Sequence, residues 1–476
     1  MNLPDYKEAR KREKKDYKVV NYQVEEKFLH KFCGKTYFLK TYGCQMNEHD
    51  SENIMAMLES LGFQRTDNYM EADLALLNTC SIRENAHNKA FGMLGRLKHV
   101  KENIKKDLVI GICGCMAQEA GVVEDILKNY KFVNFVFGTH NINELPQIVF
   151  DATKKEEQII EVYSKEGDLI EDMPVKRDHS HKAYVNIIYG CDKFCTYCIV
   201  PFTRGRERSR RKEDIIKEVE DLVKDGYQEV TLLGQNVNAY GKDIYKDYGL
   251  GELLEDVSKT NIPRVRFMTS HPWDFSDSMI EKIAKYKNIM PHIHLPIQSG
   301  SSRILKKMGR RYTKEEYLEL FNKIKKTIPN VSISTDIIVG FPGEEEEDFL
   351  ETLDICKYCQ FDNAFTFIFS KRENTPAAKL KDNITKEEKE ERLQRLNEVV
   401  NHYFLENNKK LVGKTVEVLT EGASNKPGMY YGYTDTNKLI NFTGEDVAVG
   451  ELIEVEVTSA KTWSLDGCAK SVIKNR

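Results

Sequence analysis

The most informative segment of the sequence is Gly190-Cys191-Asp192-Lys193-Phe194-Cys195-Thr196-Tyr197-Cys198, a C-x3-C-x2-C run that follows an expected strand at residues 184–188. Three thiolates on one short loop can ligate three irons of a cubic [4Fe–4S] cluster, and the lack of a fourth nearby cysteine leaves one iron open to a cofactor. A zinc loop is the alternative, but structural zinc usually takes four ligands from C-x2-C pairs, which this spacing does not supply. The run therefore predicts an iron–sulfur cluster held by Cys191, Cys195 and Cys198.

A regular series of apolar strands and amphipathic helices contains this loop. The helical spacing is clear at residues 212–224 and 314–326. Six strand–helix units fall short of the eight that close a full barrel, so residues 182–410 predict a partial (βα)6 TIM-like barrel with its site at the carboxyl ends of the strands. The expected strands are at residues 184–188, 230–233, 265–268, 293–297, 332–339 and 364–369.

The segment before the loop predicts a separate domain at residues 34–153. Short β-rich runs alternate there with helical runs, which is typical of a doubly wound α/β fold around a parallel sheet. The flanking segments lack long periodic patterns, so we expect residues 1–33 to be a mobile tail and residues 154–181 to be a linker. The expected strands are at residues 36–40, 72–77, 109–112 and 132–137, and the expected helices are at 47–61, 83–100, 118–130 and 143–152.

After a charged connecting helix, residues 411–476 show short β-rich segments that predict a small all-β barrel. This module contains seven Lys or Arg and nine Asp or Glu, so it lacks the basic balance of a nonspecific RNA-binding domain. Any RNA contact there must be local. Tyr430, Tyr431 and Tyr433 offer stacking faces and Lys438 offers one phosphate contact, but aromatic residues that pack within the barrel are an equally supported interpretation.

Three further cysteines, Cys44, Cys80 and Cys115, each follow a different expected strand of the N-terminal domain. The carboxyl ends of parallel strands share one edge of a sheet, so we expect these thiols to converge there as a second three-thiolate site. Buried free cysteine is also common in protein cores, and this is the alternative interpretation of each. Cys113 alternates to the other face of its strand and is expected in the core.

Length and composition limit the class of protein. A chain of 476 residues should contain about three domains, and its net charge of −4 gives no global sign of a nucleic-acid binder. Residues 108–117, the longest near-continuous apolar stretch, are far fewer than the ~18 of a membrane span, and residues 5–18 lack the apolar core of a secretory signal. We therefore expect a cytoplasmic protein, in which eleven cysteines favour metal binding or catalysis over disulfides. Cys356 and Cys359 have no second pair to complete a zinc site and are interpreted as packing.

Taken together, the cysteine motifs are similar to those of the radical S-adenosylmethionine (SAM) methylthiotransferases. The run at residues 190–210 resembles the radical SAM enzymes, and the segments around Cys44, Cys80 and Cys115 resemble the methylthiotransferases among them. The resemblance extends from Lys35 through the C-terminal module, which resembles the family's TRAM domain. Three branches of the family compete, and the MiaB-type branch, which acts on isopentenyladenosine of tRNA, is most similar at residues 42–48, 233–240 and 294–301.

The resemblance implies a transferase that adds a methylthio group to C2 of N6-isopentenyladenosine at position 37 of tRNA. The C2 hydrogen lies on an aromatic carbon, so a general base is poorly suited to replacing it and the hard step falls to cofactors. In the family, one SAM methylates a sulfur at the N-terminal [4Fe–4S] cluster, and a second SAM at the open iron of the other cluster gives the radical that initiates attack on C2. The implied partners are the tRNA anticodon stem-loop and an electron donor such as a flavodoxin or ferredoxin, with the chain acting as a monomer without a membrane.

Polar residues near the expected strand ends are candidates for binding SAM. Tyr197 can stack on an adenine face, although simple packing is the alternative. Arg206 belongs to the basic run at residues 204–211, whose arginines suit the SAM carboxylate or RNA phosphates, although a charge run is usually a solvated face. The remaining candidates lie where a partial barrel binds its ligand, although glycines and polar groups also serve turns and caps. They are Gly234, Gln235, Asn236, Gln298, Ser299 and Asp336.

Two other functions compete with this interpretation. The nearest is the methylthiotransferase branch that acts on threonylcarbamoyladenosine of tRNA, and the remaining branch acts on an aspartate of a ribosomal protein. The alternative from a different class is a noncatalytic RNA-binding protein whose clusters or zinc sites are structural or sense the redox state. A brown protein with iron and sulfide for two cubic clusters would exclude a zinc scaffold.

Overall fold

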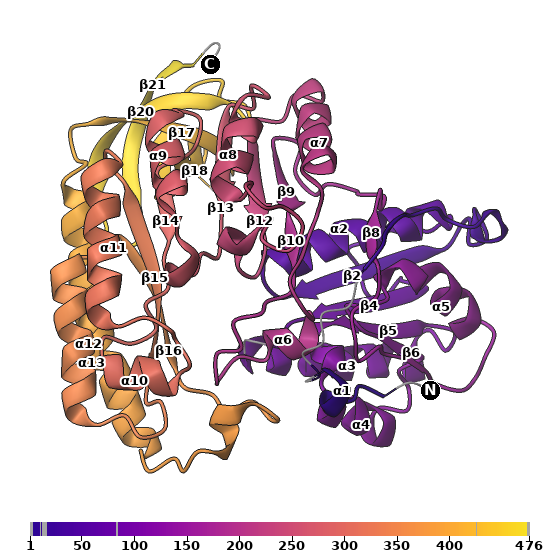
Figure 1. Cartoon of the computed structure of the whole chain (residues 1–476). Helices are drawn as coiled ribbons and strands as arrows, with labels where there is room; N and C mark the ends of the chain where they lie inside the picture. The colour runs from indigo at the N-terminus through magenta and orange to yellow at the C-terminus, as the bar shows by residue number, and fades with distance from the viewer. Residues whose placement is uncertain (1–2, 10, 12–16, 82–83, 425, 474–476) are drawn as a thin grey trace. The chain divides into compact units, whose positions relative to one another are not determined.

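The computed structural model of the chain describes residues 3–9, 11, 17–81, 84–424 and 426–473 (Figure 1). The chain divides into two compact units. The first unit contains residues 1–178, 189–193 and 198–208, and the second contains residues 179–188, 194–197 and 209–476. No described helix combines the length and the apolar composition needed to cross a membrane.

The first unit is built on a six-stranded parallel sheet in the order β3-β2-β4-β5-β6-β7. Its strand β4 (Leu74–Thr79) is buried along its whole length, as expected of a parallel strand covered on both faces. Leu74 and Leu76 belong to the apolar core with α2 and α5, whereas Ala75 and Leu77 belong to the core with α3 and α4. This two-sided packing confirms the predicted doubly wound fold. The other elements are β2 (Thr36–Tyr42), β3 (Gln64–Arg65), β5 (Val109–Gly114), β6 (Phe135–Phe137), β7 (Ile159–Glu161), α2 (Gln45–Ser60), α3 (Glu84–Asn103), α4 (Ala120–Asn129) and α5 (Leu145–Ala152).

The segments predicted to be a linker and a tail contribute strands to this unit. β7 lies within residues 154–181 and pairs in parallel with β6, and β8 (Leu169–Glu171) pairs in parallel with β1 (Val19–Asn21). Each of these strands has three residues, too few for a periodic pattern, and each pairs with a partner that the local sequence does not reveal. Residues 1–2, 10 and 12–16 of the predicted tail lie outside the described residues.

The second unit contains the predicted partial barrel as two parallel three-stranded sheets, β13-β12-β9 and β14-β15-β16. A parallel bridge joins Val265 of β13 to Ile289, just before β14. All six predicted strands are present, and both the strand at 332–339 and the helix at 212–224 match the prediction at both ends. The elements are β9 (Lys182–Asn186), β12 (Glu229–Leu233), β13 (Arg264–Phe267), β14 (His292–His294), β15 (Ser332–Val339), β16 (Asn363–Ile368), α7 (Lys212–Lys224), α8 (Leu250–Ser258), α9 (Asp277–Lys285), α10 (Ser302–Lys307), α11 (Lys314–Thr327) and α12 (Glu346–Cys359).

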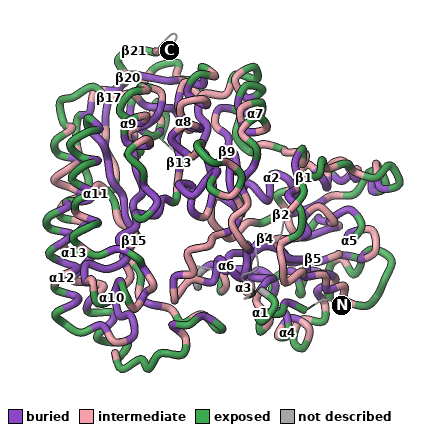
Figure 2. Tube along the Cα trace, in the orientation of Figure 1, coloured by how far each residue is buried: buried purple, intermediate pink, exposed green. Residues whose placement is uncertain are grey.

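Strands β14 and β15 have one apolar face and one polar face. Ile293 and Ile333 belong to the main apolar core, on the side where Figure 1 shows α11 and α12. On the opposite face, the rings of His292 and His294 both lie within hydrogen-bond distance of the Ser334 hydroxyl, at 3.1 and 3.0 Å. Figure 2 shows the buried strands beside exposed outer helix surfaces. The polar face is therefore available to line a site.

The cysteines predicted to be structural are buried in the cores. Cys113 of β5 packs in the core that contains α2 and α5. Cys356 and Cys359 of α12 pack in the main core of the second unit, and burial raises the pKa of Cys356 to about 12. These three thiols are neutral packing groups, as the sequence predicted.

A closed five-stranded barrel, β17-β18-β19-β21-β20, confirms the predicted C-terminal β module. Two buried arginines of β13 hold its β18–β19 turn: Arg264 and Arg266 donate four hydrogen bonds of 2.6–3.2 Å to the backbone carbonyls of residues 433–435. Glu229 of β12 accepts a hydrogen bond of 2.8 Å from Arg266 Nε. The barrel is therefore attached to the partial barrel by a buried charged clamp. Its elements are β17 (Thr415–Ala423), β18 (Met429–Thr434), β19 (Leu439–Thr443), β20 (Leu452–Ala460) and β21 (Leu465–Val472), and α13 (Lys386–Lys409) precedes them.

Candidate functional site

The three N-terminal cysteines lie at one edge of the first sheet. Cys44, Cys80 and Cys115 directly follow or lie just beyond β2, β4 and β5, which are adjacent strands. A hydrogen bond with the Cys80 thiol and the charge of Arg204 together outweigh the effect of burial and lower the pKa of Cys44 to about 6. Burial raises the pKa of Cys115, and Arg204 partly offsets this rise. The three cysteines therefore follow adjacent strands at one edge of the sheet, where the sequence predicted them.

The strand ends that carry these cysteines are held by buried amides. Asn47, in the first turn of α2, donates from Nδ2 to Asn78 Oδ1 at 3.1 Å, and Asn78 donates from Nδ2 to the Asn47 carbonyl at 2.8 Å. Gly114, just before Cys115, has φ of +92°, and a Cβ there would lie 2.4 Å from Asn78 Oδ1. Only glycine allows the chain to leave β5 in this direction. The backbone therefore places Cys115 beside the Asn47–Asn78 pair.

A buried arginine lies against these thiols. Arg204 Nε donates to Cys115 Sγ at 3.1 Å, and Arg204 Nη2 lies 2.7 Å from Asp50 Oδ2. Both charged side chains are about 95% buried, with exposed fractions of 5% and 6%. Although burial opposes the charge, Asp50 and Cys115 hold the pKa of Arg204 well above its ordinary value. A fixed positive charge therefore stabilises the anionic, metal-binding form of the Cys115 thiol.

The donor chemistry of this edge fits an iron–sulfur cluster. Thiolates are the usual ligands of such clusters, and the three adjacent thiols include one with a pKa near 6. Within the residues that the structure describes, no three His, Cys, Asp or Glu side chains are already arranged as a metal site. The edge thus supplies the right donors but not a closed coordination geometry.

The C-x3-C-x2-C loop is shared between the two units, and each part is anchored within its own unit. In the first unit, Arg206 forms a two-pronged ion pair with Asp192, with distances of 2.5 and 2.9 Å. The Cys191 N–H donates to the Gly205 carbonyl at 3.1 Å. Gly190 has φ of +73°, and a Cβ there would lie 2.1 Å from the Arg206 carbonyl oxygen. The start of the loop is therefore fixed by the segment at residues 204–207.

In the second unit, Arg310 holds the middle of the loop. Its Nη1 donates to Cys195 Sγ at 3.4 Å, and its Nη2 donates to the Pro296 carbonyl at 3.0 Å. Thr196 donates its backbone N–H to the Met308 carbonyl at 2.9 Å. Tyr197 packs against an apolar cluster that contains Met308 and Phe341, as the packing alternative predicts.

The other predicted SAM-binding residues occupy the loops after β12 and β14 and the middle of β15. Asn236 is buried and donates from Nδ2 to Asp274 Oδ2 at 2.8 Å, and Gly234 has no room for a Cβ because Ile188 would lie 2.4 Å away. Gln235 lies between them. These positions follow β12, as the sequence predicted.

Gln298 and Asp336 are brought together by the sheet. The Gln298 N–H donates to the Asp336 carbonyl at 2.8 Å, and Gln298 adopts φ of +71°, a conformation unusual for a side chain with a Cβ. Asp336 Oδ2 lies 3.4 Å from His294 Nε2 on the polar face. Ser299 is fully buried, and its hydroxyl accepts the Ser301 N–H at 3.2 Å, which is the hydrogen bond of a turn before α10. Ser299 thus supports the turn interpretation more than direct ligand contact.

The basic run at residues 204–211 is not a free cationic surface. Each of its arginines already has a partner within its own unit, so a phosphate would have to compete with those contacts. Asp50 and the Gly167 carbonyl come from distant segments of the chain, whereas the other three partners lie within 14 residues of their arginine. The pairs are Arg204–Asp50, Arg206–Asp192, Arg208 with the Gly167 carbonyl, Arg210–Glu218 and Arg211–Asp214.

Two of the aromatic and basic candidates of the C-terminal barrel are structural. Tyr430 stacks on Phe442 with a centroid distance of 6.0 Å, and Lys438 forms an ion pair with Asp362 at 2.9 Å in which both side chains are largely buried. Lys438 is therefore not the phosphate contact that the sequence suggested. Tyr431 and Tyr433 remain exposed.

Sequence reasoning missed Arg310 and the role of Arg204 against Cys115. Arg310 is one of two adjacent arginines beyond α10, and no spacing relates it to Cys195, more than 100 residues earlier. In the sequence, Arg204 stands out only as one of the arginines of the basic run at residues 204–211. A buried arginine aimed at a thiol has no sequence signature, because the contact depends on the tertiary fold.

Three family profiles match the chain. They are the Radical SAM superfamily at residues 185–356, the Uncharacterized protein family UPF0004 at residues 36–138, and the TRAM domain at residues 409–470. These segments fall on the partial barrel, the first sheet and the C-terminal barrel.

Curated relatives cover almost the whole chain. A protein of Staphylococcus haemolyticus named tRNA-2-methylthio-N(6)-dimethylallyladenosine synthase is 56% identical over 98% of this chain and 91% of its own length. A protein of Bacillus subtilis with the same name is 54% identical over 98% of this chain and 92% of its own length. A solved structure of the radical SAM methyltransferase TsrM from Kitasatospora setae, with cobalamin and a [4Fe-4S] cluster bound, has a TM-score of 0.53. It is 12% identical and covers 72% of this chain and 74% of that one, so it is similar in fold alone.

Proposed function

The chain belongs to the family of tRNA-2-methylthio-N(6)-dimethylallyladenosine synthases, and we propose that it adds a methylthio group to C2 of N6-isopentenyladenosine at position 37 of tRNA. The observation that carries this proposal is the 54–56% identity to proteins of that name over 98% of the chain. The position lies in the anticodon loop, where an unpaired base can be presented to an enclosed site.

Two sets of three cysteines are proposed to hold the inorganic cofactors. Cys191, Cys195 and Cys198 would hold one [4Fe–4S] cluster that binds SAM, and the N-terminal set of Cys44, Cys80 and Cys115 would hold the second. Bound in this way, the clusters and SAM supply the electron, the radical and the sulfur that a general base cannot provide.

Two buried arginines of the chain contact the proposed cysteine ligands and stabilise their thiolate form. Arg204 donates to Cys115 Sγ of the N-terminal set at 3.1 Å, and Arg310 donates to Cys195 Sγ of the other set at 3.4 Å. Each is proposed to be a positioning residue that holds a thiolate in place and compensates its negative charge where it is buried. Asp192 and Arg206 brace the start of the C-x3-C-x2-C loop.

The sequence-based candidates Tyr197, Gly234, Gln235, Asn236, Gln298, Ser299 and Asp336 are proposed to surround SAM. Their support is their place on or after strands of the partial barrel, where such folds bind ligands. Ser299 would act through the turn that begins α10, since its hydroxyl is buried and bonded to the Ser301 N–H.

Beyond the cofactors, we propose a monomer that works in the cytoplasm on the tRNA anticodon stem-loop and receives electrons from a flavodoxin or ferredoxin. The C-terminal barrel is proposed to contribute to RNA binding, and its matched TRAM profile supports this.

The test is a nucleoside analysis after anaerobic reconstitution. The protein is incubated with SAM, a reductant and one of three RNAs: tRNA that carries isopentenyladenosine, tRNA that carries threonylcarbamoyladenosine, or unmodified tRNA. Mass spectrometry of the digested RNA should show a methylthio group only on isopentenyladenosine. A methylthio group only on threonylcarbamoyladenosine would instead assign the chain to that activity. A variant of the exposed Cys33, Cys33→Ser, serves as the matched control and should retain full turnover.

A further inference from the structure

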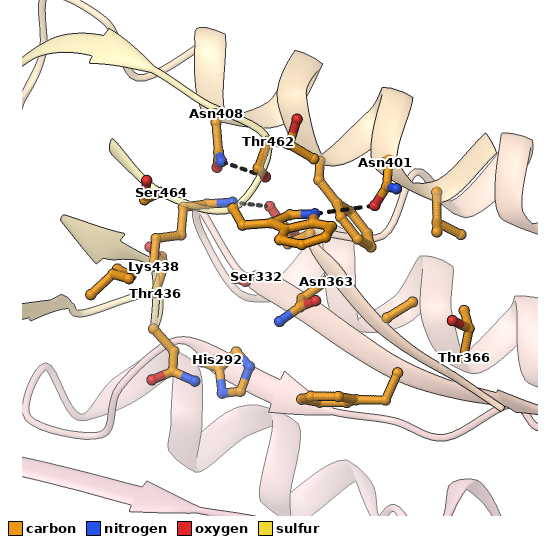
Figure 3. Close-up of a pocket in the computed structure, with 18 of the residues that line it drawn as sticks. His292, Ser332, Asn363, Thr366, Asn401, Asn408, Thr436, Lys438, Thr462 and Ser464 are labelled. Carbon is orange, nitrogen blue, oxygen red and sulfur yellow. Dashed lines mark hydrogen bonds and ion pairs between the residues drawn. The ribbon is translucent and has the colours of Figure 1, made fainter. Parts of the chain in front are cut away.

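A cavity of about 570 Å³ lies in the second unit between β16, α13 and two turns of the C-terminal barrel (Figure 3). His292, Ser332 and Asn363, the first residues of β14, β15 and β16, lie on one side of it. Asn401 of α13 and the β20–β21 turn around Trp463 lie on another. No motif in the sequence marks this cavity, because its walls come from segments far apart in the chain.

Large aromatic rings in this cavity are exposed. Trp463 is 69% exposed, and Phe365 and Phe367 on the edge strand β16 are 43% and 42% exposed. The Trp463 ring is oriented by a hydrogen bond of 3.1 Å from its Nε1 to Asn401 Oδ1. Exposed apolar surface that is gathered in one recess marks a binding site more often than a defect in packing. Flat rings of this kind stack well on other flat rings.

Side-chain amides surround these rings. Asn363, Asn397, Asn401 and Asn437 all line the cavity. Asn397 is held by the Thr366 hydroxyl, which donates to its Oδ1 at 2.7 Å. An amide carries both donors and acceptors, as the edge of a nucleobase does, so the two kinds of group are complementary.

The cavity has little net charge. Its formally charged lining residues are Asp362 and Lys438, which form an ion pair with each other at 2.9 Å. Burial lowers the pKa of His292 well below its ordinary value, so this ring is uncharged at neutral pH. A phosphate group or a metal ion would find no unpaired charge among these lining residues. A neutral, flat group with hydrogen-bonding edges fits them better.

The walls of the cavity are fixed before any ligand binds. Asn408 of α13 donates from Nδ2 to the carbonyls of Lys461 and Thr462, at 2.8 and 3.2 Å, and so holds the β20–β21 turn (Figure 3). The Arg264–Arg266 clamp holds the β18–β19 turn on the other side. A rigid recess loses little conformational entropy when a ligand enters.

We propose that this cavity binds one unpaired base of the substrate RNA, other than the base that is modified, by stacking it on Trp463 and hydrogen-bonding its edge to the surrounding amides. The inference rests on the proposed function, which supplies RNA as the occupant. The cavity extends from the first residues of β14 to β16 along the edge strand to Phe365 and Phe367, which pair with Asp336 and Ile338 of β15. Its described lining residues include none of the candidates for SAM, and its stacking ring, Trp463, belongs to the C-terminal barrel. The proposed base contact therefore uses residues other than the candidates for SAM.

The experiment pairs a protein variant with altered RNAs. The full chain, reconstituted with its clusters, is titrated with anticodon stem-loops in which one loop base at a time is replaced by an abasic site. For the unaltered protein, one abasic position other than the target should weaken binding about tenfold, the size expected for loss of one stacked base. Trp463→Ala should weaken binding of the intact RNA by about the same factor and cause no further loss with that abasic RNA.

Two controls keep the result interpretable. Tyr431→Ala removes an exposed aromatic ring from the same barrel outside the cavity and should leave the abasic effect unchanged. Trp463→Phe keeps a stacking face and should retain most of the affinity. Formation of 5′-deoxyadenosine from SAM without RNA should be unchanged in Trp463→Ala, which reports that the radical site is intact.

The proposal is overturned if Trp463→Ala binds the intact RNA as the unaltered protein does, or if every abasic RNA loses the same affinity with both proteins. Failure of the proposed function gives a different result, because the unaltered protein would then bind RNA but add no methylthio group to isopentenyladenosine.

Discussion

Arg204 illustrates how a single residue determines the character of the N-terminal cysteine edge. It is buried, it pairs with Asp50, and it donates to Cys115 Sγ. In low dielectric an isolated buried charge is costly, so neither Arg204 nor Asp50 is stable there without the other. The same guanidinium then favours the thiolate form that a cluster requires.

Replacing Arg204 with methionine should destabilise the cluster-free protein by about 3–5 kcal/mol, because it leaves the Asp50 carboxylate buried without its partner. Urea unfolding measures this change. Arg211→Met is the matched control, since the Arg211–Asp214 pair is at the surface and is worth at most about 1 kcal/mol. Equal effects of the two substitutions would show that Arg204 is not a buried structural charge.

Gly114 gives a second prediction for a single residue. Gly114→Ala should destabilise the protein and lower its iron content after reconstitution, because the positive φ is strained and the new Cβ meets Asn78 and the Thr79 carbonyl. Gly95→Ala in the helix α3 should have the opposite effect and stabilise by about 0.5–1 kcal/mol, because nothing lies within 4 Å of the added methyl group. Thermal unfolding and iron analysis of both variants test this contrast, and unchanged iron content in Gly114→Ala would contradict it.

Among the secondary-structure elements, those that bury a periodic apolar face could be predicted from sequence. The strand at Ser332–Val339 and the helix at Lys212–Lys224 match at both ends because alternation or helical spacing continues over their whole length. The three-residue strands β1, β7 and β8 could not be predicted, since pairing with distant segments stabilises them. The same limit applies to the candidate site: spacing and strand ends suffice to propose the cysteines, but Arg310 and the cavity around Trp463 depend on tertiary contacts.

The buried clamp between the partial barrel and the C-terminal barrel gives a prediction for these elements. Glu229 is buried, and although burial opposes its ionisation, Arg266 and Arg264 hold its pKa below the ordinary value. Glu229→Gln should destabilise the protein by about 3–5 kcal/mol, because two buried guanidinium groups lose their counter-charge. Limited proteolysis should then cut first near the β18–β19 turn. Asp221→Asn, at an exposed pair on α7, should leave the proteolysis pattern unchanged.

The contact of Glu421 in the C-terminal barrel with His181 and Lys182 predicts that the stability of the protein depends on pH. Burial opposes ionisation of Glu421 on β17, but His181 and Lys182 lower its pKa to about 2, with Lys182 Nζ 2.5 Å from its carboxylate. The ordinary pKa is higher, so this stabilisation is complete above about pH 4.5 and is lost as the pH falls toward 2. The difference in melting temperature between the unaltered protein and Glu421→Gln should therefore shrink over that range. A constant difference would contradict this assignment.

In the whole molecule, the two cysteine sets belong to different parts of the chain and are proposed to serve different steps. The N-terminal set lies entirely in the first unit, whereas the C-x3-C-x2-C loop is shared by both units. Each set also falls within a different family profile: the C-x3-C-x2-C loop lies within the Radical SAM superfamily match at residues 185–356, and the N-terminal set lies within the UPF0004 match at residues 36–138. If the two sets act separately, a substitution in the N-terminal set should leave SAM cleavage at the C-x3-C-x2-C loop intact.

The most direct test compares Cys80→Ala with Cys195→Ala after oxygen-free reconstitution, with 5′-deoxyadenosine and methylthiolated nucleoside measured in the same samples. Cys195→Ala should form neither product. Cys80→Ala should still form 5′-deoxyadenosine from SAM but should transfer no methylthio group to isopentenyladenosine. Full methylthio transfer by Cys80→Ala, or equal loss of both products in the two variants, would contradict the account of two thiolate sites with separate roles.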